Sequence, residues 1–289
     1  MVAVLGFLTG IILGSFTAAS SERLIKGKSL RGRSYCTECK QTLRWYDLFP
    51  VFSYLLLQGK CRYCKRPIPS ESLYIEIILG VATAFLFAFS LPAGFSGEII
   101  VTLFFKLFIL IVLSIIFLVD LKVGLIPDKV VLPASALSLI FLILFSTAKS
   151  WFFYQELLNS PLGAYLLPPQ SDYLINHLLR IWQPVFLSVI SAIGASAFFA
   201  ALIIITRGKG MGWGDVKYVL FLGLALGFPG TPMAIFLAFI LGAVFSLGLI
   251  FLRRKHFGQT IPFGPFLSLG AFIYLLLGPQ ILNWYLNLL

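Results

Sequence analysis

Long apolar runs separated by short polar segments follow one another along almost the whole chain. A membrane-crossing helix typically needs roughly 20 apolar residues, and a segment in lipid must satisfy its own backbone hydrogen bonds. The pattern therefore predicts an all-α polytopic membrane protein with about eight transmembrane helices. The sixth run is short for a bilayer, so we expect it to be tilted, partly buried or re-entrant. The expected spans are residues 2–19, 73–92, 99–119, 130–148, 182–206, 216–228, 232–252 and 263–285.

Three glycines recur at every fourth residue of the first run: Gly6, Gly10 and Gly14. Such spacing puts small residues on one helix face and permits close approach of a second helix. The alternative is that lipid merely tolerates them there.

Composition excludes a soluble protein. Of the 289 residues, 59% are hydrophobic and only 11% are charged, and the mean hydropathy is +0.97. The net charge of +11 would suggest nucleic acid as a partner of a soluble protein. In a membrane protein, the enrichment of basic residues in cytoplasmic loops explains it better, so we expect membrane lipids and no nucleic acid as partners.

The basic residues fall largely on one side of the membrane if the N-terminus lies outside. The inside segments are then 20–72, 120–129, 207–215 and 253–262, and the outer side has few basic residues, chiefly Lys149 and Arg180. This bias predicts an outside N-terminus. The first run lacks a basic segment before it, so we interpret it as a retained, signal-anchor-like helix. The segment 150–180 would lie outside, with aromatic residues suited to the interface.

Three parts of the chain are expected to be distinct. They are the first transmembrane helix, 1–19, a cytoplasmic four-cysteine loop domain, 20–72, and a membrane domain with the remaining helices, 73–289.

All four cysteines lie in the predicted loop as two Cys-x-x-Cys pairs: Cys36, Cys39, Cys61 and Cys64. Two such pairs with a short insert are typical of a tetrathiolate zinc site. Two disulfides are the alternative, which a reducing compartment disfavours. Because four thiolates leave no open coordination position, the zinc would be structural and would hold together a loop that has little core of its own.

Two aspartates lie at the ends of apolar runs. Asp120 ends the third span, and Asp215 follows the glycine-rich stretch 210–214. A carboxylate beside the hydrocarbon layer is costly to keep, so it is taken as functional by default. Two carboxyls in a half-dry site share one proton and titrate as a unit, as in aspartic proteases, where one activates water and the other polarises the carbonyl. The glycines would let an extended substrate backbone come close.

Each acid taken by itself also fits a structural role. Each aspartate could cap a helix or pair with a lysine, and two of them with a Gly-x-Gly-Asp sequence favour catalysis instead. Asp128, after Pro127, is a further candidate for catalysis or for a cap. Glu76 would line a polar cavity or snorkel, and Lys106 would snorkel or pair with an acid. The available lysines are Lys122, Lys129 and Lys217.

Together these residues resemble the type IV prepilin peptidases, also called leader peptidase/N-methyltransferases, over nearly the whole chain. The Gly-x-Gly-Asp stretch is the most specific part. The resemblance is carried by Gly14-Ser15-Phe16, both cysteine pairs, Arg44-Trp45-Tyr46-Asp47, Pro50-Val51-Phe52-Ser53-Tyr54, Glu76, Asp120 with Ile126-Pro127-Asp128, Gly210 to Lys217, and Ile261 to Phe266.

The resemblance implies an intramembrane aspartic endopeptidase of the bacterial inner membrane, with Asp120 and Asp215 as the catalytic pair facing the cytoplasm. The implied substrate is a prepilin or pseudopilin of a type IV pilus or type II secretion system, cut between its basic leader and its hydrophobic helix. It also implies methylation of the new N-terminus with S-adenosylmethionine, and expects Gly59, Lys60 and Glu76 to bind that cofactor. No glycine-rich fingerprint for the cofactor is visible in 20–72.

Two other functions are considered. One is a different Gly-x-Gly-Asp intramembrane protease, which the paired cysteines disfavour. The other is a transporter or a zinc-binding membrane module whose aspartates serve ion coupling. A transporter is expected to show paired repeats with broken helices, and no such repeat is evident in the sequence.

Overall fold

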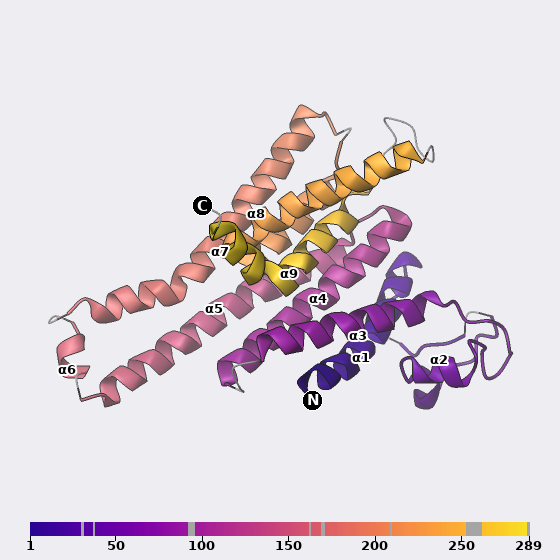
Figure 1. Ribbon diagram of the computed structural model, residues 1–289, viewed down its shortest axis with the longest axis horizontal. Coiled ribbons are helices and arrows are strands. Elements are labelled where there is room, and N and C mark those ends of the chain that lie inside the picture. Colours follow the sequence, from indigo (N-terminus) through magenta and orange to yellow (C-terminus); the bar gives the residue numbers. More distant parts are fainter. Residues whose placement is uncertain are drawn as a thin grey trace. The chain divides into compact units, whose positions relative to one another are not determined.

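The computed structural model consists of helices joined by loops (Figure 1). It describes residues 1–29, 32–36, 38–91, 96–161, 163–168, 171–208, 210–252 and 262–287. Seven helices of this described part are long and apolar enough to cross a membrane, and the only β-pairing found there is two isolated bridges. The expected all-α membrane architecture is therefore confirmed.

Some residues singled out in the sequence lie outside the described ranges. They are Lys209 and the basic residues Arg253, Arg254 and Lys255 of the expected inner segments, and Ile261 of the last motif.

The chain divides into two compact units. The first comprises Met1–Pro127 with Leu275–Leu289, and the second comprises Asp128–Tyr274. The first unit holds α1 (Val2–Ile25), η1 (Trp45–Leu48), α2 (Phe52–Leu56), α3 (Glu71–Ser90) and α4 (Gly97–Val123). The second holds α5 (Asp128–Asn159), α6 (Gly163–Leu166), α7 (Tyr173–Ile205), α8 (Trp213–Phe251) and the beginning of α9 (Gly264–Leu286).

The glycine face of α1 packs directly against α3. A Cβ atom at Gly10 would lie 1.8 Å from Thr83 Oγ1, and one at Gly14 would lie 2.6 Å from Glu76 Cα. Thr83 also donates a hydrogen bond of 2.7 Å from α3 to the Gly6 carbonyl in α1. The glycine spacing therefore serves the predicted close approach of two membrane helices.

Helices α5 and α7 are longer than the hydropathy pattern indicated. They have 32 and 33 residues, so much of the expected outer segment 150–180 is helical. Contacts between the two helices explain the extension: Phe153 stacks on His177 with ring centroids 3.9 Å apart, and Trp182 donates to Ser150 Oγ. These contacts between aromatic and polar side chains stabilise the parts of α5 and α7 that extend beyond the apolar runs.

The expected sixth and seventh spans form the single element α8, which is kinked between them. Gly227 has φ 62° and Phe228 is extended, just before Pro229. Proline lacks an amide hydrogen and disfavours helix before it, so the helix breaks there. Thr231 donates to the Gly227 carbonyl at 2.9 Å, which satisfies an acceptor that the kink exposes. The seven long helices thus contain all eight expected apolar runs.

Replacing Gly10 with alanine should destabilise the protein because the new methyl group would collide with α3. The expected cost is about 1–3 kcal/mol, the usual range for overpacking, and a lower midpoint of thermal unfolding in detergent would report it. Gly194→Ala in α7 is the matched control, because a Cβ there meets no atom within 4 Å. Equal midpoints for the two variants would show that α1 and α3 are not closely packed.

Candidate active site and metal centre

The four cysteines of the first unit converge on one point. Their Sγ atoms all lie within 4.8 Å of one another, and those of Cys36 and Cys64 are 3.9 Å apart. Tetrahedral zinc with bonds of about 2.3 Å would set its sulfurs about 3.8 Å apart, whereas a disulfide needs about 2.05 Å. The donor set and its spacing therefore fit a metal ion of the zinc type, with no disulfide among these residues.

The two cysteine pairs have the same backbone conformation. The Cys36 amide donates to the Gln41 carbonyl at 3.0 Å, and the Cys61 amide donates to the Arg66 carbonyl at 2.8 Å. In each pair the residue after the second cysteine has a positive φ of 57°; these residues are Lys40 and Lys65. The two halves of the loop thus repeat both the Cys-x-x-Cys sequence and the backbone hydrogen bonds around it.

The pKa values of two of the thiols, Cys36 and Cys64, are shifted in opposite directions. Hydrogen bonds from the Cys39 and Glu38 amides lower the pKa of Cys36 to about 7. For Cys64, the Arg66 amide acts to lower the pKa, but burial and the neighbouring thiols outweigh it and raise the pKa to about 11. Four sulfurs this close do not all ionise together near neutrality without a cation to balance them.

Asp47 ties the insert between the two pairs to the second pair. Its carboxylate, only 3% exposed, accepts hydrogen bonds from Arg62 Nε at 2.7 Å and Tyr63 Oη at 3.0 Å, and one from the Arg44 amide. Burial acts to raise the pKa of Asp47, but these hydrogen bonds outweigh it and hold the pKa below its ordinary value. Apart from the resemblance carried by residues 44–47, no pattern in the sequence predicted this role.

A cavity of about 490 Å³ lies between the cysteine loop and the adjoining ends of α1, α3 and α4. This volume is in the range of small-molecule sites. Its lining includes acidic and basic side chains from all four elements, among them Glu22, Lys26, Glu71, Glu76 and Lys122. From the sequence, Glu76 was expected to line a polar cavity or to snorkel. The other walls were not predicted, because they come from segments that are far apart along the chain.

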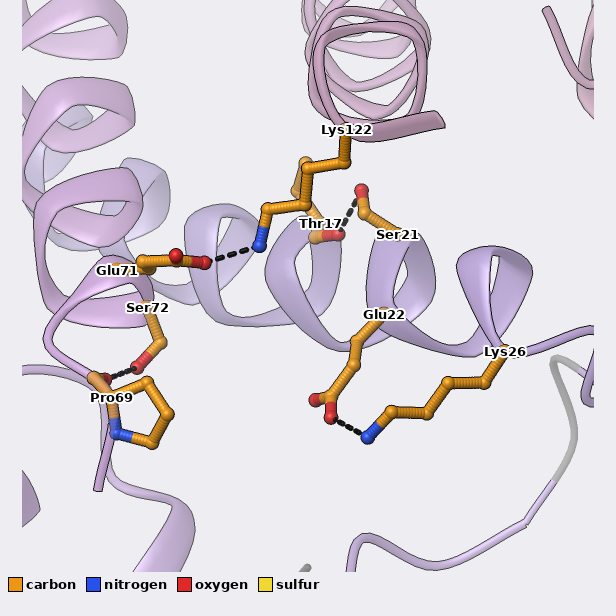
Figure 2. A network of polar contacts seen from close by, with 8 residues as sticks. All are labelled: Thr17, Ser21, Glu22, Lys26, Pro69, Glu71, Ser72 and Lys122. Carbon is orange, nitrogen blue, oxygen red and sulfur yellow. Dashed lines mark hydrogen bonds and ion pairs between the residues drawn. The ribbon is translucent and has the colours of Figure 1, made fainter. Parts of the chain in front are cut away.

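Figure 2 shows the charged wall of this cavity. Lys122, from the end of α4, reaches Glu71 at the start of α3, and Glu22 pairs with Lys26 on α1. Lys122 was a sequence candidate to neutralise Asp120, but its ion pair with Glu71 instead joins the ends of α3 and α4.

Glu76 lies at the cavity and is 7% exposed. Its Oε2 accepts a hydrogen bond of 2.7 Å from the Val51 amide, which directly precedes α2. The buried glutamate therefore anchors the cysteine loop to α3 and lines the cavity, so it does not snorkel.

Gly59 and Lys60 do not line this cavity. Gly59 is buried with φ 68°, and a Cβ there would lie 2.9 Å from Tyr54 Oη. Lys60 is exposed beside the second cysteine pair. The structure thus gives Gly59 a conformational reason to be glycine, and the cofactor role of both residues stays a prediction.

Lys106 lies within α4 and donates to Ser90 Oγ at 3.2 Å, at the end of α3. This contact places the ammonium beside a polar helix terminus. Among the described residues, no salt bridge of Lys106 is found.

Asp120 lies in the last turn of α4 and is 3% exposed. The helix ends at Gly124, which has φ 68° and donates its amide to the Asp120 carbonyl at 2.8 Å. A glycine in this left-handed conformation is a common helix terminator. Gly124 therefore ends α4 one turn after Asp120, so Asp120 lies in the last turn of the helix.

Asp215 lies in the first turn of α8 and is 8% exposed. Its Oδ2 accepts a hydrogen bond of 3.0 Å from the Gly212 amide, so it caps the helix. The capping role considered from the sequence is thus present, and it leaves Oδ1 for other partners. Asp120 belongs to the first unit and Asp215 to the second.

Lys217, two residues after Asp215, pairs with Asp128 through both carboxylate oxygens at 2.7 and 2.9 Å. Asp128 is the first residue of α5 and its side chain is 52% exposed. The two aspartate motifs therefore share a feature. In each, the lysine two residues after the aspartate forms an ion pair with the first residue of another helix.

Tyr218 lies in α8 three residues after Asp215. It is fully buried, and its hydroxyl lies 2.7 Å from Ser268 Oγ in α9. This hydrogen bond joins the beginning of α8 to α9, two residues after the motif 261–266. Sequence reasoning missed both residues, since a tyrosine and a serine within apolar runs carry no distinct signal.

Substituting Cys61 with serine should abolish stoichiometric zinc binding, because a tetrathiolate site loses one of four strong ligands. Elemental analysis of purified protein would measure the ion-to-chain ratio, expected near one for the native chain. Lys60→Ser introduces the same residue next door and should leave the ratio unchanged. A native chain without zinc, or a Cys61 variant that keeps it, would contradict the site.

Comparison with known proteins places the chain in a family. Residues 8–90 match the bacterial peptidase A24 N-terminal domain, and residues 173–247 match the type IV leader peptidase family. The first range contains the four cysteines and Glu76, and the second contains Asp215, whereas Asp120 lies between them. No solved structure matches the chain.

Curated relatives agree over most of the length. The prepilin leader peptidase/N-methyltransferase of Aeromonas salmonicida (strain A449) is 29% identical over 88% of this chain and 75% of its own length. The one of Bacillus subtilis (strain 168) is 28% identical over 98% of this chain and 97% of its own. The one of Pseudomonas aeruginosa is 28% identical over 88% of this chain and 74% of its own.

The two matched ranges together cover more than half of the chain, and they contain the cysteine centre and the Gly-x-Gly-Asp motif that the structure describes. The chain therefore belongs to the type IV leader peptidase family and is a multi-pass membrane protease.

Proposed function

We propose that Asp120 and Asp215 are the catalytic pair of this protease and that it removes the basic leader of a prepilin or pseudopilin. The observation that carries the proposal is a matched pair of buried carboxyls, one in the last turn of α4 and one in the first turn of α8. If every long apolar helix crosses the membrane once, the order of crossings supports a position for both helix ends on the side of the cysteine loop. That side is the cytoplasm of a bacterial inner membrane by the distribution of basic residues.

The pair would work as a general acid and a general base. One carboxylate takes a proton from water, which attacks the carbonyl carbon of the scissile peptide bond. The protonated partner donates a hydrogen bond to the carbonyl oxygen and later delivers a proton to the leaving amine. The products are the leader with a new carboxyl terminus and the mature chain with a free amino terminus.

The lysine two residues after each aspartate forms an ion pair with another acid. Lys122 pairs with Glu71, and Lys217 pairs with Asp128. These pairs tie the helix ends that carry the two aspartates to the first residues of α3 and α5.

Glycines beside Asp215 fit an approaching substrate backbone. A Cβ at Gly212 would meet no atom closer than 3.9 Å, and one at Gly210 none closer than 3.5 Å. Neither packing nor a positive φ therefore requires glycine at these positions. Their lack of side chains is explained if an extended peptide comes close to Asp215.

Asp120→Asn and Asp215→Asn should each abolish leader cleavage of a model prepilin, because each removes the ionisable group and keeps the shape. Loss of a catalytic acid or base costs at least about 10²-fold in rate. Gel or mass-spectrometric detection of the freed leader is the measurement. Asp172→Asn, at the start of α7 on the opposite side of the membrane, is the matched control and should cleave normally.

If both variants cut at the native rate, the aspartates are helix caps or ion-path residues, and the transporter alternative regains support. Asp128→Asn refines the result. It should retain substantial cleavage if Asp128 serves only to hold Lys217.

We further propose that the chain methylates the new amino terminus and that the cavity beside the cysteine loop binds S-adenosylmethionine. The relatives carry this second activity in their names, and the cavity supports it for this chain. When bound, the cofactor would supply a methyl group on a positively charged sulfur. Carboxylates of Glu22, Glu71 and Glu76 suit such a cation, and Lys26 and Lys122 suit its carboxylate.

The cysteine loop, 20–72, would then be a separable module beside the first helix, 1–19, and the membrane domain, 73–289. Its metal, proposed to be zinc, would be structural and would hold the loop in the fold that forms the cavity wall.

Glu76→Gln should reduce methylation by roughly tenfold or more while leaving cleavage intact, because it removes a charge at the cavity and keeps an acceptor for the Val51 amide. Mass spectrometry of the mature product reports both activities in one sample. Glu98→Gln, at the opposite end of the membrane from the loop, should change neither. Full methylation by the Glu76 variant would contradict a role for this glutamate in binding the cofactor.

A further inference from the structure

The insert of the cysteine loop exposes a cluster of large apolar side chains. We call it the loop patch; it comprises Trp45, Phe49, Phe52, Leu55 and Leu56 of η1, α2 and the turn between them. Trp45 is 77% exposed and Leu56 is 82% exposed. Phe49, Phe52 and Leu56 of the patch line an open groove of about 290 Å³. Contiguous exposed apolar surface of this kind usually contacts another protein or a membrane.

A hydrogen bond fixes the depth of the patch relative to the membrane helices. Val51, the residue before α2, donates to Glu76, which lies in the second turn of α3 and packs on Gly14 of α1. From Gly14, α1 continues to Ile25, which is roughly 16 Å at the helical rise of about 1.5 Å per residue. The start of α2 therefore lies near the level of Gly14, within the apolar run of α1 and roughly 16 Å before the last residue of that helix.

Charge around the patch matches a lipid surface. Arg44 precedes η1 and Lys60 follows α2, and both are exposed. The nearby acids Asp47 and Glu38 are already paired with Arg62 and Arg66. Tryptophan, phenylalanine and leucine beside basic side chains are the composition of segments that lie in the membrane interface.

We propose that the loop patch inserts into the membrane at the boundary between headgroups and acyl chains, with Arg44 and Lys60 at anionic lipid phosphates. The short helix α2 then lies on the bilayer and holds the cysteine loop against the membrane. Because Val51 bonds to Glu76, the lipid contact also steadies one wall of the cavity. This inference does not depend on the proposed catalytic pair.

The test uses the full-length protein in lipid nanodiscs and the fluorescence that Trp45 contributes, taken as the difference between the native chain and Trp45→Phe. Lipids brominated near the headgroup end of the acyl chain should quench this contribution strongly, and lipids brominated near the methyl end should quench it less. Dissolved iodide should quench it weakly. Replacing the zwitterionic lipid by a mixture rich in phosphatidylglycerol should increase the bromine quenching.

Variants separate the contribution of the patch from a general loss of structure. Leu55→Asp with Leu56→Asp should abolish bromine quenching of Trp45 while zinc content stays native. Arg44→Gln with Lys60→Gln should remove the dependence on phosphatidylglycerol.

Three results would overturn the proposal. Strong iodide quenching without bromine quenching would put the patch in water. Protection from both quenchers would mean that protein, such as a second copy of the chain, covers it. Unchanged bromine quenching in the double aspartate variant with native zinc would show that Leu55 and Leu56 take no part.

Discussion

Polar groups near the hydrocarbon layer need partners within the protein, because lipid supplies none, and several groups of this chain have them. Thr83 satisfies the Gly6 carbonyl across two helices, and Thr231 satisfies the carbonyl freed at the kink of α8. Glu76 and Asp215 each accept a backbone amide from a loop. The same constraint confines acids to helix ends, where water and a peptide substrate can reach them.

Close packing of α1 on α3 makes the first unit possible. Glycine on α1 lets the helices approach, and the approach puts Glu76 where it can hold Val51 and with it the cysteine loop. The loop has little apolar core, so it depends on the metal-type cysteine centre, on Asp47 and on this contact with α3. The cavity exists because these supports keep the loop over the ends of three helices.

Hydropathy predicted the membrane helices well because burial in lipid is a property of each run by itself. It misjudged the lengths of α5 and α7, since their ends are held by contacts such as Phe153 on His177. Cysteine spacing predicted that the four thiols would gather at one point, because the geometry of a Cys-x-x-Cys pair is local. The position of the cavity and the partners of the two lysines could not be predicted from the sequence. Lys122 and Lys217 bond to acids 51 and 89 positions away, and no local pattern selects those partners.

The central claim is that Asp120 and Asp215 act as one pair, and the most direct test is the separation of their carboxyl oxygens. A cryo-electron microscopy structure of the protein in nanodiscs, with and without a prepilin peptide, would measure it. The account predicts that in the substrate complex the two carboxyls lie within hydrogen-bonding reach, about 3 Å directly or through one water. A separation beyond roughly 10 Å in both states, too wide for one water to bridge, would contradict a shared catalytic proton.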